Sequence, residues 1–165
     1  MIYWFYGQPG AGKTTLANAL EKRLLSEDPS LRTVRIDGDE MREIFNNKDY
    51  TPEGRKRNMK QVNDIIRFLS KKGFVVIVSV VAPYLESREQ IRDLDPTMVY
   101  LWTDMVRGRE HYATKDMQIG KDDYELKTDE PDKEFDGLTI KNKSIDKCLD
   151  EVIEFHTSSP LPSVC

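Results

Sequence analysis

The chain has 165 residues, of which 38% are hydrophobic and 33% are charged. This composition is typical of one globular domain with a core of its own and a well-solvated surface, and we expect the whole chain to be that domain. The formal net charge of −4 and the lack of a basic block argue against general nucleic-acid binding.

The first predicted elements are a short strand, a glycine-rich loop and a helix. The apolar residues 2–6 predict a buried strand, and residues 14–27 carry apolar side chains at helical spacing. Between them stands the pattern G-x-x-x-x-G-K-T, formed by Gly7, Gln8, Pro9, Gly10, Ala11, Gly12, Lys13 and Thr14. A strand, this pattern and a helix together predict a phosphate-binding loop.

The chemistry of that loop follows from its residue types. Glycines let successive backbone N–H groups point into one concavity, and the helix behind them adds the positive end of its dipole. We expect Lys13 to contact the β- and γ-phosphates of a nucleotide and the Thr14 hydroxyl to bind Mg²⁺. The alternative, an ordinary glycine-rich turn, is disfavoured by the flanking pattern.

A second strand and two helices are predicted next. Residues 31–36 form a strand, the sequence Asp37-Gly38-Asp39 ends it, and a short helix covers residues 40–45. Thr51-Pro52-Glu53 has the capping hydroxyl, the proline and the early carboxylate of a helix start. That helix should run to about residue 72 and stop at Gly73.

The continuous apolar run 74–79 predicts a central parallel strand that is covered on both faces. The longest apolar run, 74–83, is too short to span a bilayer, so we expect no membrane association. A helix over 85–93 and a strand over 98–102 follow. The charged segment 103–135 is expected to be a partly helical, mobile excursion.

A strand over 137–140 and a helix capped by Ser144 complete the elements, with Ile145, Leu149, Val152 and Ile153 inward and a loose tail over 157–165. Strands that alternate with helices predict an α/β fold of the P-loop NTPase type. Such a fold is a three-layer sandwich, a parallel sheet with helices on both faces. The cysteines, Cys148 and Cys165, have no metal-ligand neighbour and favour free thiols in a reducing, cytoplasmic environment.

The carboxyl ends of parallel strands form the ligand-binding edge of such a sheet. Asp37 and Asp39 follow the second strand and can accept a proton from an acceptor hydroxyl and help to hold Mg²⁺. The alternative is a D-G turn in which Asp39 caps the next helix. The 74–79 strand ends in no acidic residue, so one of these two aspartates is expected on the metal side.

The long helix places Arg55 and Asn58 at the end of its apolar face, where an inward arginine should meet an anion. Arg42 on the preceding helix can converge with them. The alternative is that Arg55 faces water. Tyr50 can stack on a ring or simply pack, and Arg107 or Arg109 in the charged excursion can neutralise transferring phosphate.

With these residues in hand, the chain resembles the adenylylsulfate (APS) kinase family, whose members phosphorylate the 3′-hydroxyl of adenosine 5′-phosphosulfate with MgATP. The resemblance covers roughly residues 1–102. It rests on Gly7-Gln8-Pro9-Gly10-Ala11-Gly12-Lys13-Thr14-Thr15, Asp37-Gly38-Asp39-Glu40-Met41-Arg42, Tyr50-Thr51-Pro52-Glu53-Gly54-Arg55-Lys56-Arg57-Asn58 and Ser79-Val80-Val81-Ala82-Pro83-Tyr84.

The resemblance implies that Asp37 is the general base and that Asp39 helps to hold Mg²⁺. It implies further that the acceptor nucleotide is bound by Arg42, Arg55, Asn58, a stacking Tyr50 and the backbone near Ala82 and Pro83. The implied partners are small nucleotides. A homodimer is one of the oligomeric states that the sequence leaves open.

The chain also departs from the family pattern. It has Gly54 where the family usually has Asp, Arg57 where it has Glu, and Ala82 where it has Ser, and the family's Phe-Thr-Gly lid is not recognisable beyond residue 103. Two alternatives follow. One is a related kinase that acts on another 5′-modified nucleotide or small hydroxyl compound. The other is a nucleotide-binding regulatory protein without turnover.

Overall fold

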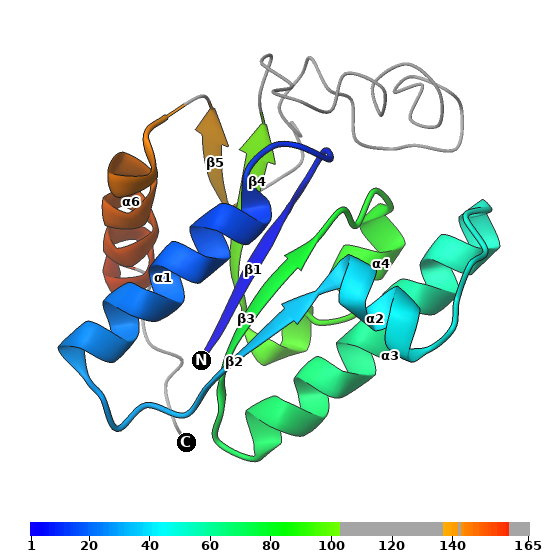
Figure 1. Cartoon of the computed structure of the whole chain (residues 1–165), viewed down its shortest axis with the longest axis horizontal. Coiled ribbons are helices and arrows are strands. Elements are labelled where there is room, and N and C mark those ends of the chain that lie inside the picture. Colours follow the sequence, from blue (N-terminus) through cyan, green and yellow to red (C-terminus); the bar gives the residue numbers. More distant parts are fainter. Residues whose placement is uncertain (103–136, 142, 159–165) are drawn as a thin grey trace.

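Five parallel strands form one sheet in the order β2-β3-β1-β4-β5 (Figure 1). The structure, a computed structural model, describes residues 1–102, 137–141 and 143–158. The strands are β1 (Ile2–Gly7), β2 (Thr33–Asp37), β3 (Val75–Val80), β4 (Thr97–Trp102) and β5 (Leu138–Lys141). Because β1 lies between β3 and β4, the glycine-rich loop that follows β1 starts from the middle of the sheet's carboxyl edge.

Helices cover both faces of this sheet (Figure 1). They are α1 (Lys13–Glu27), α2 (Gly38–Ile44), α3 (Pro52–Lys71), α4 (Leu85–Glu89), the 3₁₀ turn η1 (Arg92–Leu94) and α6 (Ile145–Ser158). One face carries α1 and α6, and the other carries α2, α3 and α4. The predicted α/β sandwich of the P-loop NTPase type is therefore confirmed.

Alternation along β1 explains the two cores. Trp4 and Tyr6 pack with the apolar face of α3, whereas Tyr3 and Phe5 pack against α1 and α6. All six residues of β1 are buried, as expected for a parallel strand between two helical layers. The central position of β3 was predicted from its continuous apolar run and is confirmed.

The start of α3 follows its sequence signals. Thr51 is the N-cap and its hydroxyl accepts a 3.2 Å hydrogen bond from the Gly54 amide, while Pro52 occupies the first turn. Met59, Val62 and Ile66 are buried on the predicted apolar face. This helix therefore has a fixed first turn close to the end of α2.

Three local predictions were wrong. The single helix expected over 85–93 is split into α4 and η1, with Ile91 fully buried between them. Ile145 was expected to point inward but is 41% exposed, because the first turn of α6 overhangs the core. The helix α6 also extends to Ser158, past the expected start of the tail.

The charged segment 103–135 and residues 159–165 lie outside the described residues. Within the part of the chain that is described, no helix is long and apolar enough to cross a bilayer.

Candidate active site

The glycine-rich loop between β1 and α1 folds around Lys13. Gly10 and Gly12 have φ of 81° and 88°, a left-handed backbone that favours glycine. Lys13 is buried, with 9% exposure. Its Nζ donates a 2.7 Å hydrogen bond to the Gln8 carbonyl. Gly7 runs so close to β4 that an added Cβ would lie 2.1 Å from the Leu101 carbonyl oxygen. The loop is thus held in a compact turn by its neighbours.

Asp37 joins this loop to the ends of two neighbouring strands. Its Oδ2 accepts hydrogen bonds of 2.9 Å from the Thr14 hydroxyl and 2.9 Å from the Ser79 hydroxyl. Asp37 and Ser79 are register partners across β2 and β3, which places their side chains at the same level of the sheet edge. Sequence reasoning gave Ser79 no role of its own. The signal that could have found it is a polar residue at the end of an apolar strand. In the structure Ser79 is 6% exposed.

Asp39 is placed differently from Asp37. Asp37 is the N-cap of α2, and its Oδ1 accepts a 2.9 Å hydrogen bond from the Asp39 amide. The capping role considered for Asp39 therefore belongs to Asp37, while the Asp39 side chain is exposed. Hydroxyl and carboxylate oxygens are the ligands that Mg²⁺ prefers, so the donor set around Thr14 fits that ion.

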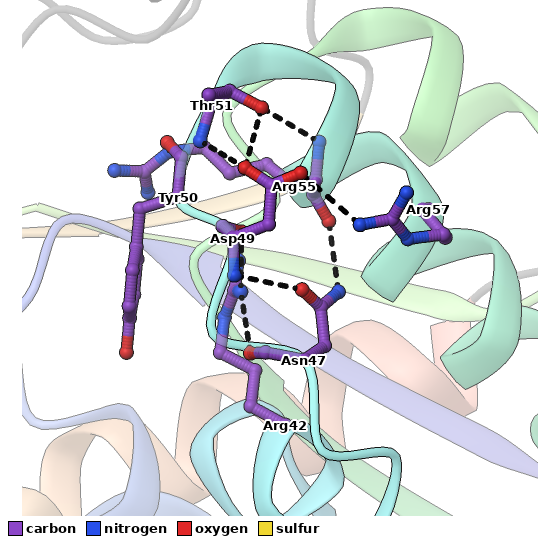
Figure 2. Close-up of polar contacts among 8 residues, drawn as sticks. Arg42, Asn47, Asp49, Tyr50, Thr51, Arg55 and Arg57 are labelled. Carbon is purple, nitrogen blue, oxygen red and sulfur yellow. Dashed lines mark hydrogen bonds and ion pairs between the residues drawn. The ribbon is translucent and has the colours of Figure 1, made fainter.

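Arg42 and Arg55 converge on Tyr50, as Figure 2 shows. Their guanidinium carbons lie 4.4 Å and 5.7 Å from the centre of the Tyr50 ring. Burial lowers the pKa of Arg42 from its usual value, and the like charge of Arg55 lowers it further. Two cations beside an aromatic ring that is 61% exposed form a surface suited to an anionic, ring-bearing ligand.

Asn58 lies one turn after Arg55 on α3 and points inward, as predicted. It is 4% exposed, and its Oδ1 has no hydrogen-bond partner among the described residues. A buried amide oxygen without a partner is costly unless another group satisfies it.

The backbone after β3 is strained at Ala82. Its φ is 43°, an uncommon value for a residue with a side chain, and both Ala82 and Pro83 are buried. Arg88 holds this segment by donating a 3.0 Å hydrogen bond from Nη1 to the Ala82 carbonyl. Arg88 is 3% exposed and lies over the Tyr6 ring at 5.1 Å. No sequence signal pointed to it, because an arginine in a short helix usually faces solvent.

Thr15 is exposed on the first turn of α1. Arg107 and Arg109, which were predicted to contact phosphate, lie outside the described residues. Within the described ranges, no three His, Cys, Asp or Glu side chains gather in a group that could hold a metal ion.

Comparisons with known proteins bear on the family and the fold. Residues 1–118 match the family model described as adenylylsulphate kinase. The adenylyl-sulfate kinase of Staphylococcus carnosus is 35% identical over 95 residues, which are 57% of this chain and 47% of that protein. The probable adenylyl-sulfate kinase of Archaeoglobus fulgidus is 42% identical over 92 residues, which are 55% of this chain and 58% of that protein.

The matched part of the chain spans about half the length of these curated relatives. Among solved structures, the Mycobacterium tuberculosis APS kinase CysC in complex with AMPPNP and APS aligns with a TM-score of 0.73 at 23% identity. That alignment covers 95% of this chain and 97% of the other, and it supports the fold.

Proposed function

The chain belongs to the adenylylsulphate kinase family, and from this membership we propose that it transfers the γ-phosphoryl group of ATP to a hydroxyl. The acceptor that we propose is adenosine 5′-phosphosulfate, at its 3′-hydroxyl. One observation carries the proposal: Asp37 contacts the phosphate loop through Thr14 and stands at the strand edge that also carries Ser79. A carboxylate in that place can contact both the site for the phosphate donor and the hydroxyl of the acceptor.

The donor half is the loop Gly7–Thr15, with Lys13 and the backbone N–H groups as the phosphate ligands. Thr14 and Asp39 would hold Mg²⁺, which supplies charge neutralisation between the phosphates when it is bound. The ammonium group of Lys13 donates to the Gln8 carbonyl, which places it close to the turn. Arg107 and Arg109 stay predicted contributors to ATP binding.

Asp37 is the proposed general base. A carboxylate offers about four acceptor positions, and Thr14, Ser79 and Asp39 occupy three of them in this structure. The position that is left can accept the proton of an acceptor hydroxyl. The hydrogen bonds from Ser79 and Asp39 fix the direction of that lone pair, which is what a base needs to orient its substrate.

The acceptor half is formed by Arg42, Tyr50, Arg55 and Asn58, with Ala82 and Pro83 beside it. The two guanidinium groups suit a phosphosulfate or phosphate, and the exposed Tyr50 ring suits a base. The Mycobacterium tuberculosis protein of similar fold was solved with a nucleotide analogue and APS. This combination supports an anionic nucleotide as the acceptor class.

A related kinase with another acceptor is the second candidate, favoured by Gly54. The Cβ of any other residue there would lie 2.3 Å from Asp49 Cγ, so the acidic residue usual in the family cannot fit this turn unchanged. A coupled assay with MgATP across APS and other 5′-modified nucleotides separates the two candidates. We expect turnover with APS, whereas robust turnover on another acceptor and none on APS would contradict it.

A nucleotide-binding protein without turnover would bind ATP and phosphorylate no acceptor in the same assay.

We further propose that the protein works in a reducing, cytoplasmic environment, in keeping with the buried free thiol of Cys148. The homodimer stays a prediction, which light scattering on the purified chain measures.

A further inference from the structure

The turn between α2 and α3 is tied to both helices by a hydrogen-bond network (Figure 2). Arg42, near the end of α2, donates from Nη1 to the carbonyl of Asp49 at 2.9 Å and to that of Asn47 at 3.3 Å. On the other side, Asn47 Nδ2 donates to the Gly54 carbonyl at 3.0 Å, and Arg55 Nε donates to the Tyr50 carbonyl at 2.9 Å. The backbone on both sides of Tyr50 is therefore fixed.

The carboxylate of Asp49 is the hub of this turn. Its Oδ1 accepts from the Thr51 amide at 2.9 Å and from the Thr51 hydroxyl at 2.6 Å, and its Oδ2 accepts from Arg57 Nη2 at 3.1 Å. The Thr51 hydroxyl in turn accepts the Gly54 amide and caps α3. These hydrogen bonds from Thr51 lower the pKa of Asp49 below its ordinary value. The same carboxylate thus organises the turn and the helix start.

Gly54 makes this arrangement fit. A Cβ at residue 54 would lie 2.3 Å from Asp49 Cγ, 2.4 Å from its carbonyl oxygen and 2.6 Å from its Cβ. Real Cβ atoms essentially never approach so closely, so a side chain at residue 54 would displace Asp49. The close approach also brings Asn47, which is 8% exposed, against the Gly54 carbonyl.

Tyr50 is the residue that this network presents. It stands between Asp49 and Thr51, which are joined by the Asp49 carboxylate, and its ring projects from the turn toward solvent (Figure 2). The ring is 61% exposed, so core packing does not hold it in place. What fixes its direction is the backbone on either side and the guanidinium groups of Arg42 and Arg55.

We propose that Asp49 is a positioning residue for acceptor recognition, which acts by holding the turn that directs Tyr50 and Arg42 toward the acceptor. Gly54 leaves the space that Asp49 occupies, and Arg57 donates a hydrogen bond to the Asp49 carboxylate. This inference rests on the proposed kinase function, in that Tyr50 and Arg42 belong to the acceptor half. In this proposal Asp49 acts through Tyr50 and Arg42.

Steady-state kinetics with MgATP and APS test the proposal. Asp49→Ala should raise the KM for APS about tenfold, since it removes the two hydrogen bonds from Thr51. The KM for ATP and kcat should stay within about twofold, because the phosphate loop is untouched. Asp49→Asn keeps an oxygen for Thr51 and should restore most of the acceptor affinity.

Asp64→Ala is the matched control, since Asp64 forms an exposed ion pair with Lys60 in the middle of α3. It should leave every constant unchanged. Gly54→Ala is a second route to the same effect: alanine is favoured over glycine inside a helix, but its Cβ displaces Asp49. An unchanged KM for APS in both Asp49→Ala and Gly54→Ala would overturn the proposal, as would equal changes in the KM values of both substrates.

Amide hydrogen exchange separates this inference from the proposed function, because it needs no substrate. The amides of Thr51 and Gly54 should exchange at least tenfold faster in Asp49→Ala than in the wild type, with the centre of α3 unchanged. If the wild type does not phosphorylate APS, the proposed function fails and exchange alone decides. Unchanged protection of Thr51 and Gly54 would then overturn the role of Asp49.

Discussion

The Thr14 hydroxyl donates a 2.9 Å hydrogen bond to Oδ2 of Asp37, which joins the phosphate loop directly to the end of β2. Thr14 is also the residue proposed to hold Mg²⁺. A hydroxyl would bind the ion through an oxygen lone pair and could still donate its hydrogen to Asp37. The proposed metal ligand and the proposed base are therefore joined by one hydrogen bond.

Asp37→Asn should lower kcat by roughly 10²- to 10⁴-fold, the range expected for loss of a general base. An amide still accepts hydrogen bonds from Ser79 and Thr14 but takes no proton, so ATP binding should stay within a few-fold. Glu40→Gln, an exposed carboxylate on the same helix α2, is the control and should keep full activity. Unimpaired turnover in Asp37→Asn would remove the base assignment.

Ser79→Ala should lower kcat about three- to tenfold with little effect on the KM for ATP. The Ser79 hydroxyl donates to Asp37 Oδ2 at 2.9 Å from a buried strand end, and its loss leaves the carboxylate less well oriented. Ser79→Thr keeps a hydroxyl and should recover much of the rate. A loss of the same size in Ser79→Thr and Ser79→Ala would indicate packing instead of orientation.

Arg88→Met should destabilise the fold by about 2 kcal/mol, the order expected when a buried charge-assisted hydrogen bond to a carbonyl is lost. Urea unfolding measures it, with Arg92→Met as the control on the more exposed Arg92–Glu89 pair. The acceptor KM should rise as well, because the strained Ala82 backbone loses its support. Stability equal to that of the control would contradict the structural role of Arg88.

His156 should make stability depend on pH. Burial, followed by the charge of the amino terminus, lowers its pKa from the ordinary value of 6.5. The unfolded chain then binds a proton more readily, so the free energy of unfolding falls as pH drops below about 6.5 and levels off below the folded pKa. His156→Asn should abolish this component in urea unfolding between pH 8 and 5. If the variant shows a pH dependence of the same size, the dependence arises from another titratable group.

Local signals in the sequence were enough for much of the fold. The glycine-rich loop, the Thr51-Pro52 helix start and the apolar face of α3 each depend on residues that are close in sequence. The break between α4 and η1 could not be predicted in this way, because it depends on Ile91 packing into a core whose other residues are distant in the sequence.

The residues of the site also differ in how far the sequence predicts them. Strand ends and helix faces can be predicted from periodicity, and such positions are held by Asp37, Arg42, Arg55 and Asn58. Arg88 and Gly54 matter through contacts with Ala82 and Asp49 that only the folded chain reveals. For Asp49 a local signal did exist: Asp two residues before Thr favours a turn in which the carboxylate bonds the following backbone.

Phosphorylation of the 3′-hydroxyl of APS is tested directly by comparing APS with its 3′-deoxy analogue as acceptors of label from [γ-³²P]ATP. We predict labelled product with APS, none with the 3′-deoxy compound, and a loss of label with the Asp37→Asn enzyme. Labelling of the 3′-deoxy analogue, or ATP binding without transfer to APS, would contradict the proposed function.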